Sequence, residues 1–208
     1  MATVNSVPYA PPVAETTALE DRSPLRASLV FASVILLGFG LSYSLAGAAL
    51  GRLLFPHQAG GSIVMMDGKA RGSSLVAQPF SDARYFQPRP SAANYDPMAA
   101  AGSNLARSNP DLRKRIDELT QQVARREGLP PAQVPGELVT QSGSGLDPHL
   151  SPLGARVQVA RVARARGLSE AEVAAVVQAH TEAPQFGVLG ESRVNVLQLN
   201  LALDRIRP

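Results

Sequence analysis

One short segment carries the side-chain types of a hydrolase. Residues 141–149 include two serines, an aspartate and a histidine. A hydroxyl, a carboxylate and an imidazole form an acyl-transfer triad when they meet in space, so a serine hydrolase using Ser144 and Asp147 is one interpretation. Its histidine would be His149 or His180. A nucleophile elbow, however, has glycine two residues before and after its serine, and Ser144 has serine and leucine there. The spacing therefore favours a glycine-rich loop without a catalytic role.

The small residues of this loop, which begins at Ser142, have structural roles to fill. Gly143 and Gly145 are expected to supply backbone angles, or close backbone approaches, that a Cβ atom hinders. Asp147 and Ser151 are expected to accept hydrogen bonds from backbone N–H groups before a helix begins. The loop is thus predicted to be structural.

His180 lies in a helical pattern and shares its face with Val173, Val176 and Val177. Such a pattern is more typical of a packed histidine than of a metal ligand. The chain has three histidines and no cysteine, which gives a zinc site little support. We therefore expect no metal-binding residue.

The stretch from Gly61 to Lys69 superficially resembles a phosphate-binding loop. That motif needs four residues between its glycines and Ser or Thr after its lysine, but here six residues separate Gly61 from Gly68, and Ala70 follows the lysine. A β-hairpin turn is predicted instead. The sequence also has no Asp-Lys-Thr-Gly-Thr phosphorylation motif and no Thr-Val-Gly-Tyr-Gly filter. We therefore expect the chain neither to hydrolyse ATP by itself nor to form a potassium pore.

The composition predicts one membrane segment and one modest soluble domain. Of 208 residues, 45% are hydrophobic and 18% are charged, with a net charge of +3. This excess of positive charge is small, and no aromatic residues alternate with the basic ones, so a nucleic-acid partner is not expected.

The anchor is the uncharged run Ala27–Leu50, which as a helix covers about 36 Å and can cross a bilayer. We expect a transmembrane helix over residues 26–52, in which Gly40 and Gly47 allow another helix to approach closely. The small residues around Gly47 also suggest a signal-peptide cleavage site, but the apolar run is longer than a usual signal core. Basic flanking residues do not decide the orientation. Residues 1–23 are predicted to be a disordered tail.

Residues 53–208 are predicted to form one α+β domain. Ser62–Met66 and Ser74–Gln78 are its candidate strands, joined in a β-hairpin by the Asp67-Gly68 turn signal. The stretch from Pro79 to Asn109 is expected to run irregularly over the surface, held by aromatic anchors.

Helices are predicted to follow, and each has start and stop signals. The first begins after Asn109 and ends at Gly128, and the second runs from Pro152 to Arg166. The third begins at the Ser169/Glu172 capping box, has His180 on its apolar face and is closed by Pro184. The last carries an apolar face of Val196, Leu199, Leu203 and Ile206. The second helix has a basic side of four arginines: Arg156, Arg161, Arg164 and Arg166. We interpret it as a solvated face or, alternatively, as a contact for anionic lipid headgroups or an acidic partner.

Several short motifs in fixed order resemble one known family. They are Tyr85-Phe86, Arg89-Pro90-Ser91-Ala92, Gly102-Ser103-Asn104, Leu138-Val139-Thr140, residues 142–149, Ser151-Pro152, Gln158, Arg161-Val162-Ala163, Ala165-Arg166, His180-Thr181, Leu189-Gly190-Glu191, residues 193–197, Leu199-Asn200 and Ala202-Leu203-Asp204. Over roughly residues 24–206 the chain resembles the C subunit of the Kdp-type potassium-importing P-type ATPase. The tail before Ser23 looks longer than that family typically carries.

The resemblance implies a non-catalytic accessory subunit of a bacterial inner-membrane complex. Its partners would be a channel-like potassium-binding subunit, a P-type ATPase subunit and a very small fourth membrane subunit, with ATP and potassium used by the complex. The N-terminus would be cytoplasmic and the 53–208 domain extracytoplasmic, over the potassium-binding partner. The family is described as a catalytic chaperone that raises the ATP affinity of the pump, but a domain outside the membrane cannot touch cytoplasmic ATP. We therefore expect such an effect only through coupling.

No residue is expected to be catalytic. The alternative functions are a membrane-anchored serine hydrolase and an envelope ligand-binding protein. The candidate structural or interaction residues are Gly40, Gly47, Tyr85, Phe86, Arg89, Asn104, Ser142, Gly143, Ser144, Gly145, Asp147, His149, Gln158, His180, Asn195 and Asn200.

Overall fold

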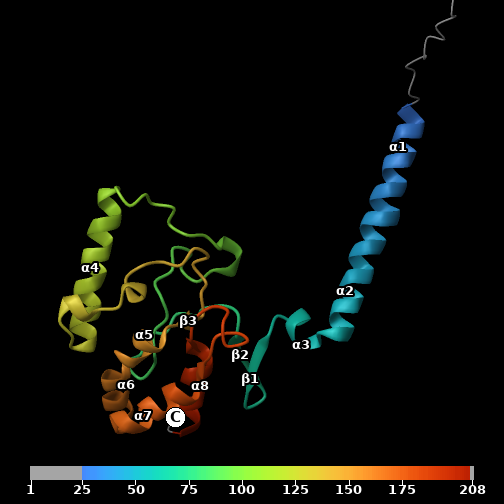
Figure 1. The fold of residues 1–208 in the computed structure, drawn as a ribbon. Helices are drawn as coiled ribbons and strands as arrows, with labels where there is room; N and C mark the ends of the chain where they lie inside the picture. The colour runs from blue at the N-terminus through green and yellow to red at the C-terminus, as the bar shows by residue number, and fades with distance from the viewer. Residues whose placement is uncertain (1–24, 207–208) are drawn as a thin grey trace, which may run out of the picture. The chain divides into compact units, whose positions relative to one another are not determined.

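The computed structural model describes residues 25–206, and the predicted tail 1–23 lies outside them (Figure 1). The chain divides into two compact units, with the boundary between Gly51 and Arg52.

The described part of the first unit belongs to one helix, which is uncharged from Ala27 to Leu50 and continues three residues past the boundary, to Leu54. It is built from α1 (Leu25–Ser33), the π-helical segment η1 (Val34–Leu41) and α2 (Ser42–Leu54). Within the described residues, Leu25–Leu54 is the one helix long and apolar enough to cross a membrane, and none of it is buried. π-helical turns are rare and often mark functional positions, and here η1 contains Gly40.

After the end of α2, the second unit continues with a short helix, α3 (Pro56–Ala59), and the predicted hairpin. Strands β1 (Ile63–Met66) and β2 (Lys69–Ser73) pair antiparallel around Asp67-Gly68, whose φ angles of 53° and 70° fit a two-residue hairpin turn. The prediction of the second strand at Ser74–Gln78 was wrong. A two-residue turn places Lys69 directly opposite Met66, so the polar residues after the turn form the strand although they lack an apolar pattern.

The irregular stretch after the hairpin is confirmed and holds one short 3-10 turn, η2 (Pro97–Ala99). Helix α4 (Pro110–Glu127) follows, and two more 3-10 turns, η3 (Pro131–Gln133) and η4 (Gly136–Leu138), come after it. The predicted ends of α4 are correct: the Asn109 side chain accepts a hydrogen bond from the Asp111 N–H, and Gly128 has the left-handed conformation that stops a helix.

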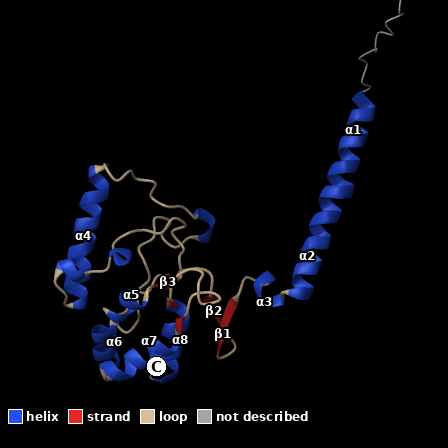
Figure 2. Cartoon of the chain, viewed as in Figure 1, coloured by secondary structure: helices blue, strands red, loops and turns tan. Residues whose placement is uncertain are grey.

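The helical half of the domain contains α5 (Pro152–Arg156), α6 (Val159–Arg166), α7 (Glu170–Ala179) and α8 (Val196–Ile206) (Figure 2). The prediction of one helix over 152–166 was wrong, because the chain breaks at Val157 and Gln158, where the Gln158 side chain bonds the Gly154 carbonyl. The Ser169/Glu172 capping box is confirmed. Helix α7 ends at Ala179, before the predicted stop at Pro184, so the prediction of His180 on its apolar face was wrong: His180 caps the helix and its N–H bonds the Val176 and Val177 carbonyls.

A small sheet that the sequence did not predict joins these helices. Its strands β3 (His149–Leu150), β4 (Thr181–Glu182) and β5 (Arg193–Asn195) lie in the order β3-β5-β4, all antiparallel. They are too short to show an alternating pattern. One apolar core includes residues from the sheet and the helices together with one residue of the irregular stretch: Phe86, Val123, Leu138, Leu150, Val162, Val173, Val194, Leu199 and Leu203. The α+β prediction, with one N-terminal apolar helix, an early hairpin and later helices, is confirmed, although Ile206 is exposed.

Candidate functional site

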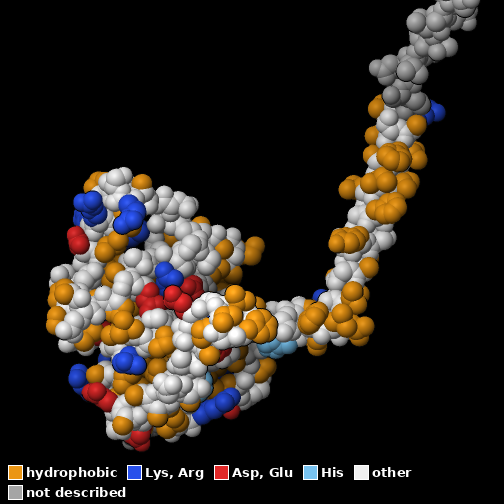
Figure 3. Space-filling model, viewed as in Figure 1, with side chains coloured by type: hydrophobic (Ala, Val, Ile, Leu, Met, Phe, Trp, Pro, Cys, Tyr) orange, Lys and Arg blue, Asp and Glu red, His pale blue; other side chains and the backbone are white. Residues whose placement is uncertain are grey.

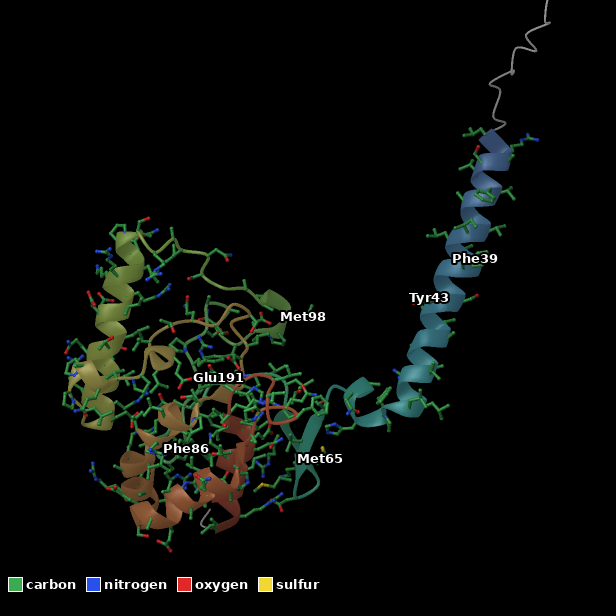
Figure 4. All side chains as sticks on the ribbon, viewed as in Figure 1. Phe39, Tyr43, Met65, Phe86, Met98 and Glu191 are labelled. Carbon is green, nitrogen blue, oxygen red and sulfur yellow. The ribbon has the colours of Figure 1, made fainter. Side chains whose placement is uncertain are left out.

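The irregular residues 83–89, here called the clamped segment, are fixed by polar side chains of the helices. Phe86 is 0% exposed and lies among the side chains of the helical half (Figure 4). Its N–H donates to Asn200 Oδ1 at 2.8 Å, and its carbonyl accepts from Asn200 Nδ2 at 2.9 Å. A buried backbone that belongs to no strand needs such partners, and one carboxamide on α8 supplies both.

A second carboxamide repeats this arrangement at the next residue. Gln158 is fully buried; its Oε1 accepts from the Gln87 N–H at 2.9 Å and its Nε2 donates to the Gln87 carbonyl at 3.1 Å. Asn200 and Gln158 thus satisfy four consecutive backbone groups of the clamped segment. The structure brings together candidate residues that lie far apart in the sequence.

A buried ion pair adds to the contacts that hold the clamped segment; together these holding side chains are called the clamp. The Glu127 side chain is fully buried and Arg161 is 9% exposed, with Arg161 Nε donating to Glu127 Oε2 at 2.9 Å. The same guanidinium donates to the carbonyls of Ala83 at 2.7 Å and Tyr85 at 3.0 Å, and to Gln158 Oε1 at 2.8 Å. Every group of the pair therefore has a counterpart, which is the condition for a tolerable buried charge.

A third contact holds the ring of Tyr85. Arg166 pairs with Asp204 at 2.8 Å, donates from Nε to the Arg84 carbonyl, and lies 5.1 Å from the centroid of the Tyr85 ring. The Tyr85 hydroxyl donates to Asp204 at 3.2 Å. Tyr85, held by Arg166 and Asp204, and the buried Phe86 are thus the aromatic anchors expected in this stretch.

Only part of the basic side predicted for residues 156–166 faces solvent. Arg161 and Arg166 are buried, whereas Arg156 and Arg164 are exposed, so the prediction of one solvated face was wrong for two of the four. Sequence reasoning also missed the buried acid Glu127. A signal was available, because Glu127 continues the apolar stripe of α4 four residues after Val123, and a carboxylate at a buried position requires a cation.

The loop over residues 141–149 is held by turns and one ion pair. Ser144 is exposed and its Oγ accepts from the Leu146 N–H at 3.1 Å, while Asp147 Oδ1 accepts from the His149 N–H at 3.0 Å. Among the hydrogen bonds of residues 25–206, none joins Ser144 to a histidine. His180 instead bonds the Val176 carbonyl through Nδ1 at 2.9 Å. This arrangement does not assemble a hydrolase triad.

The Asp147 carboxylate is the electrostatic centre of the loop. Burial raises its pKa, but hydrogen bonds from His149 and the ion pair with Arg89 at 3.0 Å outweigh that effect, and the net pKa lies below the ordinary value. The resulting stabilisation is present above the pKa of the unfolded carboxyl group and is lost as the pH falls through the lower, folded-state pKa.

The remaining candidates lie apart from the clamp. Asn195, which is buried, accepts from the Gln198 N–H at the start of α8 and donates to the Ser74 carbonyl. Asn104 is exposed and has a positive φ of 51°. Gly40 and Gly47 lie on the apolar helix, where an added Cβ atom meets nothing within 4 Å inside the chain. Ser142 is buried, and its carbonyl accepts from the Gly145 N–H.

The two loop glycines differ in a way that can be tested. Gly145 has φ +70°, and a Cβ atom there would lie 2.7 Å from the Ala101 carbonyl oxygen, whereas an added Cβ on Gly143 meets nothing within 4 Å. The expectation that both need to be glycine was therefore wrong for Gly143. We expect Gly145→Ala to lower the free energy of unfolding by about 2 kcal/mol or more, from left-handed strain plus the clash.

Denaturant unfolding of the full chain in mild detergent measures this difference. Gly143→Ala and Ser144→Ala are the matched controls. Each is expected to change the free energy of unfolding by less than about 0.5 kcal/mol, because a Cβ atom at position 143 meets no other atom and Ser144 is exposed. Equal effects at the two glycines would contradict the account and indicate an ordinary flexible loop.

Comparison with known proteins covers both units. The model of the family described as "KdpC: K+-transporting ATPase, c chain" matches residues 25–205. A protein of Xanthomonas oryzae pv. oryzae named "Potassium-transporting ATPase KdpC subunit" is 64% identical over 187 residues, which are 90% of this chain and 90% of that protein. Proteins with the same name from Sorangium cellulosum and Shewanella putrefaciens are 53% and 50% identical, each over 88% of this chain and over 98% and 89% of their own lengths.

Proposed function

Because the chain belongs to the KdpC family of K+-transporting ATPase c chains, with an accessory role in potassium uptake, we propose that it is a non-catalytic subunit that stabilises assembly of the pump. The subunits it would hold together are the potassium-binding, channel-like subunit and the ATP-hydrolysing P-type subunit, with a very small fourth membrane subunit beside them. Potassium and ATP would be used by the complex as a whole.

The observation that carries the proposal is the extent of the family match. Residues 25–205 include the apolar helix Leu25–Leu54 and all but the last described residue of the domain that follows it. A subunit that contacts its partners both in the membrane and outside it needs these two parts. We propose that the helix spans the bacterial inner membrane with its N-terminus in the cytoplasm and with the domain of residues 53–208 outside.

The clamp suits an assembly role. A buried ion pair and carboxamide contacts take the place of strand pairing in the clamped segment, so a partly buried irregular stretch is held in one conformation. A rigid surface loses less conformational entropy on binding than a flexible one does. The clamped segment and its neighbours would therefore present a preformed surface to a partner.

An effect on ATP affinity is proposed only through coupling between subunits. A domain outside the membrane meets no cytoplasmic ATP, so any change in the KM for ATP would come from a conformational equilibrium of the ATPase subunit that assembly biases. Comparing the KM for ATP of the complex purified with and without this chain tests the proposal. A lower KM in the presence of the chain supports coupling, and an unchanged KM with unchanged turnover would count against any regulatory role.

The small residues of the helix give a separate prediction. Gly40→Leu and Gly47→Leu should each reduce recovery of the partner subunits severalfold, because the added bulk blocks close helix approach while the helix stays apolar enough to insert. Ser44 is four residues after Gly40 and three before Gly47, and its Oγ donates to the Gly40 carbonyl at 2.8 Å, so one face of the helix here has only small side chains. The measurement is co-purification with a tagged chain in mild detergent, together with alkaline extraction to check insertion.

Ala27→Leu, at the edge of the uncharged run, is the matched control and should leave recovery of the partners unchanged. Full recovery of the partners with both glycine variants would show that helix packing does not depend on these positions.

A further inference from the structure

The turn between β4 and β5 has three large, exposed apolar side chains within four residues. Phe186 is 83% exposed, Val188 is 79% exposed and Leu189 is 58% exposed. We call residues 185–190 the apolar turn, and this turn contains no charged residue. Single exposed apolar side chains are common on folded domains, whereas a contiguous group of them marks a contact surface. The apolar turn is therefore a candidate interaction surface.

Further apolar side chains are exposed in the same region of the domain. Figure 3 shows hydrophobic side chains gathered beside β1 and β2. Leu75 is exposed just after this hairpin, and β5 contacts the same segment, because Asn195 Nδ2 donates to the Ser74 carbonyl at 2.7 Å. The strand that follows the apolar turn thus adjoins other exposed apolar surface.

The backbone of the apolar turn is held in one conformation. Gln185 and Leu189 exchange two backbone hydrogen bonds of 2.9 Å each, and the Gly187 N–H donates to the Pro184 carbonyl at 2.9 Å. A segment that is already ordered loses little conformational entropy when a partner binds. The three apolar side chains are therefore presented on a preformed support.

Phe186 has a backbone conformation that phenylalanine rarely adopts. Its φ angle is +55°, and Gly187 follows with +76°. In the turn between β1 and β2 the same pair of positive φ angles belongs to Asp67-Gly68, a sequence suited to such turns. A bulky residue in the left-handed region costs free energy, so local folding does not explain a phenylalanine at this position. Strained residues of this kind occur where a function uses them.

The charge beside the apolar turn distinguishes between kinds of partner. Glu191 is exposed and forms no ion pair within residues 25–206. Glu182 and Arg193, on the two strands that the turn joins, neutralise each other at 2.8 Å. The turn thus has a negative border. Anionic lipid attracts basic segments and repels acidic ones, so this border favours a protein partner over a lipid surface.

We propose that the apolar turn docks into an apolar cleft of another subunit of the pump, with Phe186 inserted into the cleft and Glu191 paired with a Lys or Arg side chain at its edge. This inference rests on the assembly role proposed above, and it names a surface that performs that role. An aromatic side chain buries a large apolar area with few rotatable bonds, which is why such side chains carry much of the binding energy of interfaces.

Reassembly of the pump tests the proposal. The partner subunits are purified in mild detergent from cells that lack this chain, and the full chain is titrated into them. Phe186→Ala is expected to raise the chain concentration for half-maximal reassembly at least about 10-fold, because the inserted ring is removed. Leu153→Ala is the matched control: Leu153 is an exposed apolar residue of α5, and its truncation should leave this concentration unchanged. Unfolding of both variants, measured in parallel, separates lost binding from lost folding.

Substitution of Glu191 tests the charged part of the contact. Glu191→Lys should weaken reassembly more than Glu191→Gln does, because it replaces an attraction by a repulsion, and added salt should narrow the difference. Glu118→Lys, the same reversal at an exposed position of α4, should have no effect. Equal effects of Glu191→Lys and Glu118→Lys would contradict the paired charge.

Phe186→Trp separates a protein partner from a lipid surface, since the chain has no tryptophan of its own. In vesicles of phosphatidylglycerol with brominated acyl chains, which hold this chain alone, the fluorescence of the new tryptophan should not be quenched. Quenching would show insertion into lipid and overturn the proposal. If the wild-type chain does not reassemble with the partner subunits, the assembly role fails and this inference with it. If the wild-type chain and Phe186→Ala reassemble equally well, the assembly role stands and only this inference is wrong.

Discussion

Arg161→Ala is expected to lower the free energy of unfolding by about 3–5 kcal/mol, which makes it one of the two most damaging single substitutions in the domain. The truncation leaves the fully buried Glu127 carboxylate without its closest buried cation, and only the partly exposed Arg126 still pairs with it. It also removes the donors that satisfy the carbonyls of Ala83 and Tyr85. One substitution therefore removes both the main counter-charge of Glu127 and two of the hydrogen bonds that hold the clamped segment.

Arg164→Ala is the matched control, because Arg164 belongs to the same helix, is exposed and forms no ion pair in the described part of the chain. Its cost should stay below about 0.5 kcal/mol. Both variants are compared by denaturant unfolding of the full chain in mild detergent, followed by circular dichroism. Equal stabilities would mean that the buried ion pair does not hold the domain together.

Phe86→Ala is expected to cost a similar amount, about 3–5 kcal/mol, for a different reason. The ring is 0% exposed and belongs to the main core, so its removal leaves a cavity lined by side chains from several elements. The two hydrogen bonds between Asn200 and the backbone of residue 86 prevent this segment from moving inward to fill that cavity.

The chain offers a control of the same residue type. Phe186 lies in the turn between β4 and β5 and is 83% exposed, so Phe186→Ala should change the free energy of unfolding by less than about 0.5 kcal/mol. The same unfolding measurement applies. A small effect of Phe86→Ala would show that the segment is a surface loop and not part of the core.

Features with local causes could be predicted from the sequence. Asn109, Ser151 and Ser169 accept hydrogen bonds from the first backbone N–H groups of their helices, and Gly128 and Gly167 adopt the left-handed conformation that ends them. The apolar helix and the Asp67-Gly68 turn belong to the same class. Each signal lies within a few residues of the structure it specifies.

The clamp could not be predicted, because its contacts join distant positions. Asn200 bonds the backbone of Phe86 across 114 residues, and Arg161 reaches Glu127 across 34. The motifs that resemble the family pointed to Tyr85, Phe86, Gln158 and Asn200, but not to which of them meet. A basic stretch such as residues 156–166 is compatible with exposure or with burial until the opposing carboxylates are placed. The strands β3, β4 and β5 are similarly hidden, since pairing with distant partners defines them.

Co-purification tests most directly the proposal that this chain holds the subunits of a potassium pump together. A tagged full-length chain is expressed in its native bacterium under potassium limitation, extracted in mild detergent and purified. The account predicts that the potassium-binding and ATP-hydrolysing subunits are recovered with it, with potassium-stimulated ATPase activity, and that Arg161→Ala reduces their recovery while Arg164→Ala does not. A folded chain that is recovered alone under these conditions would contradict the account.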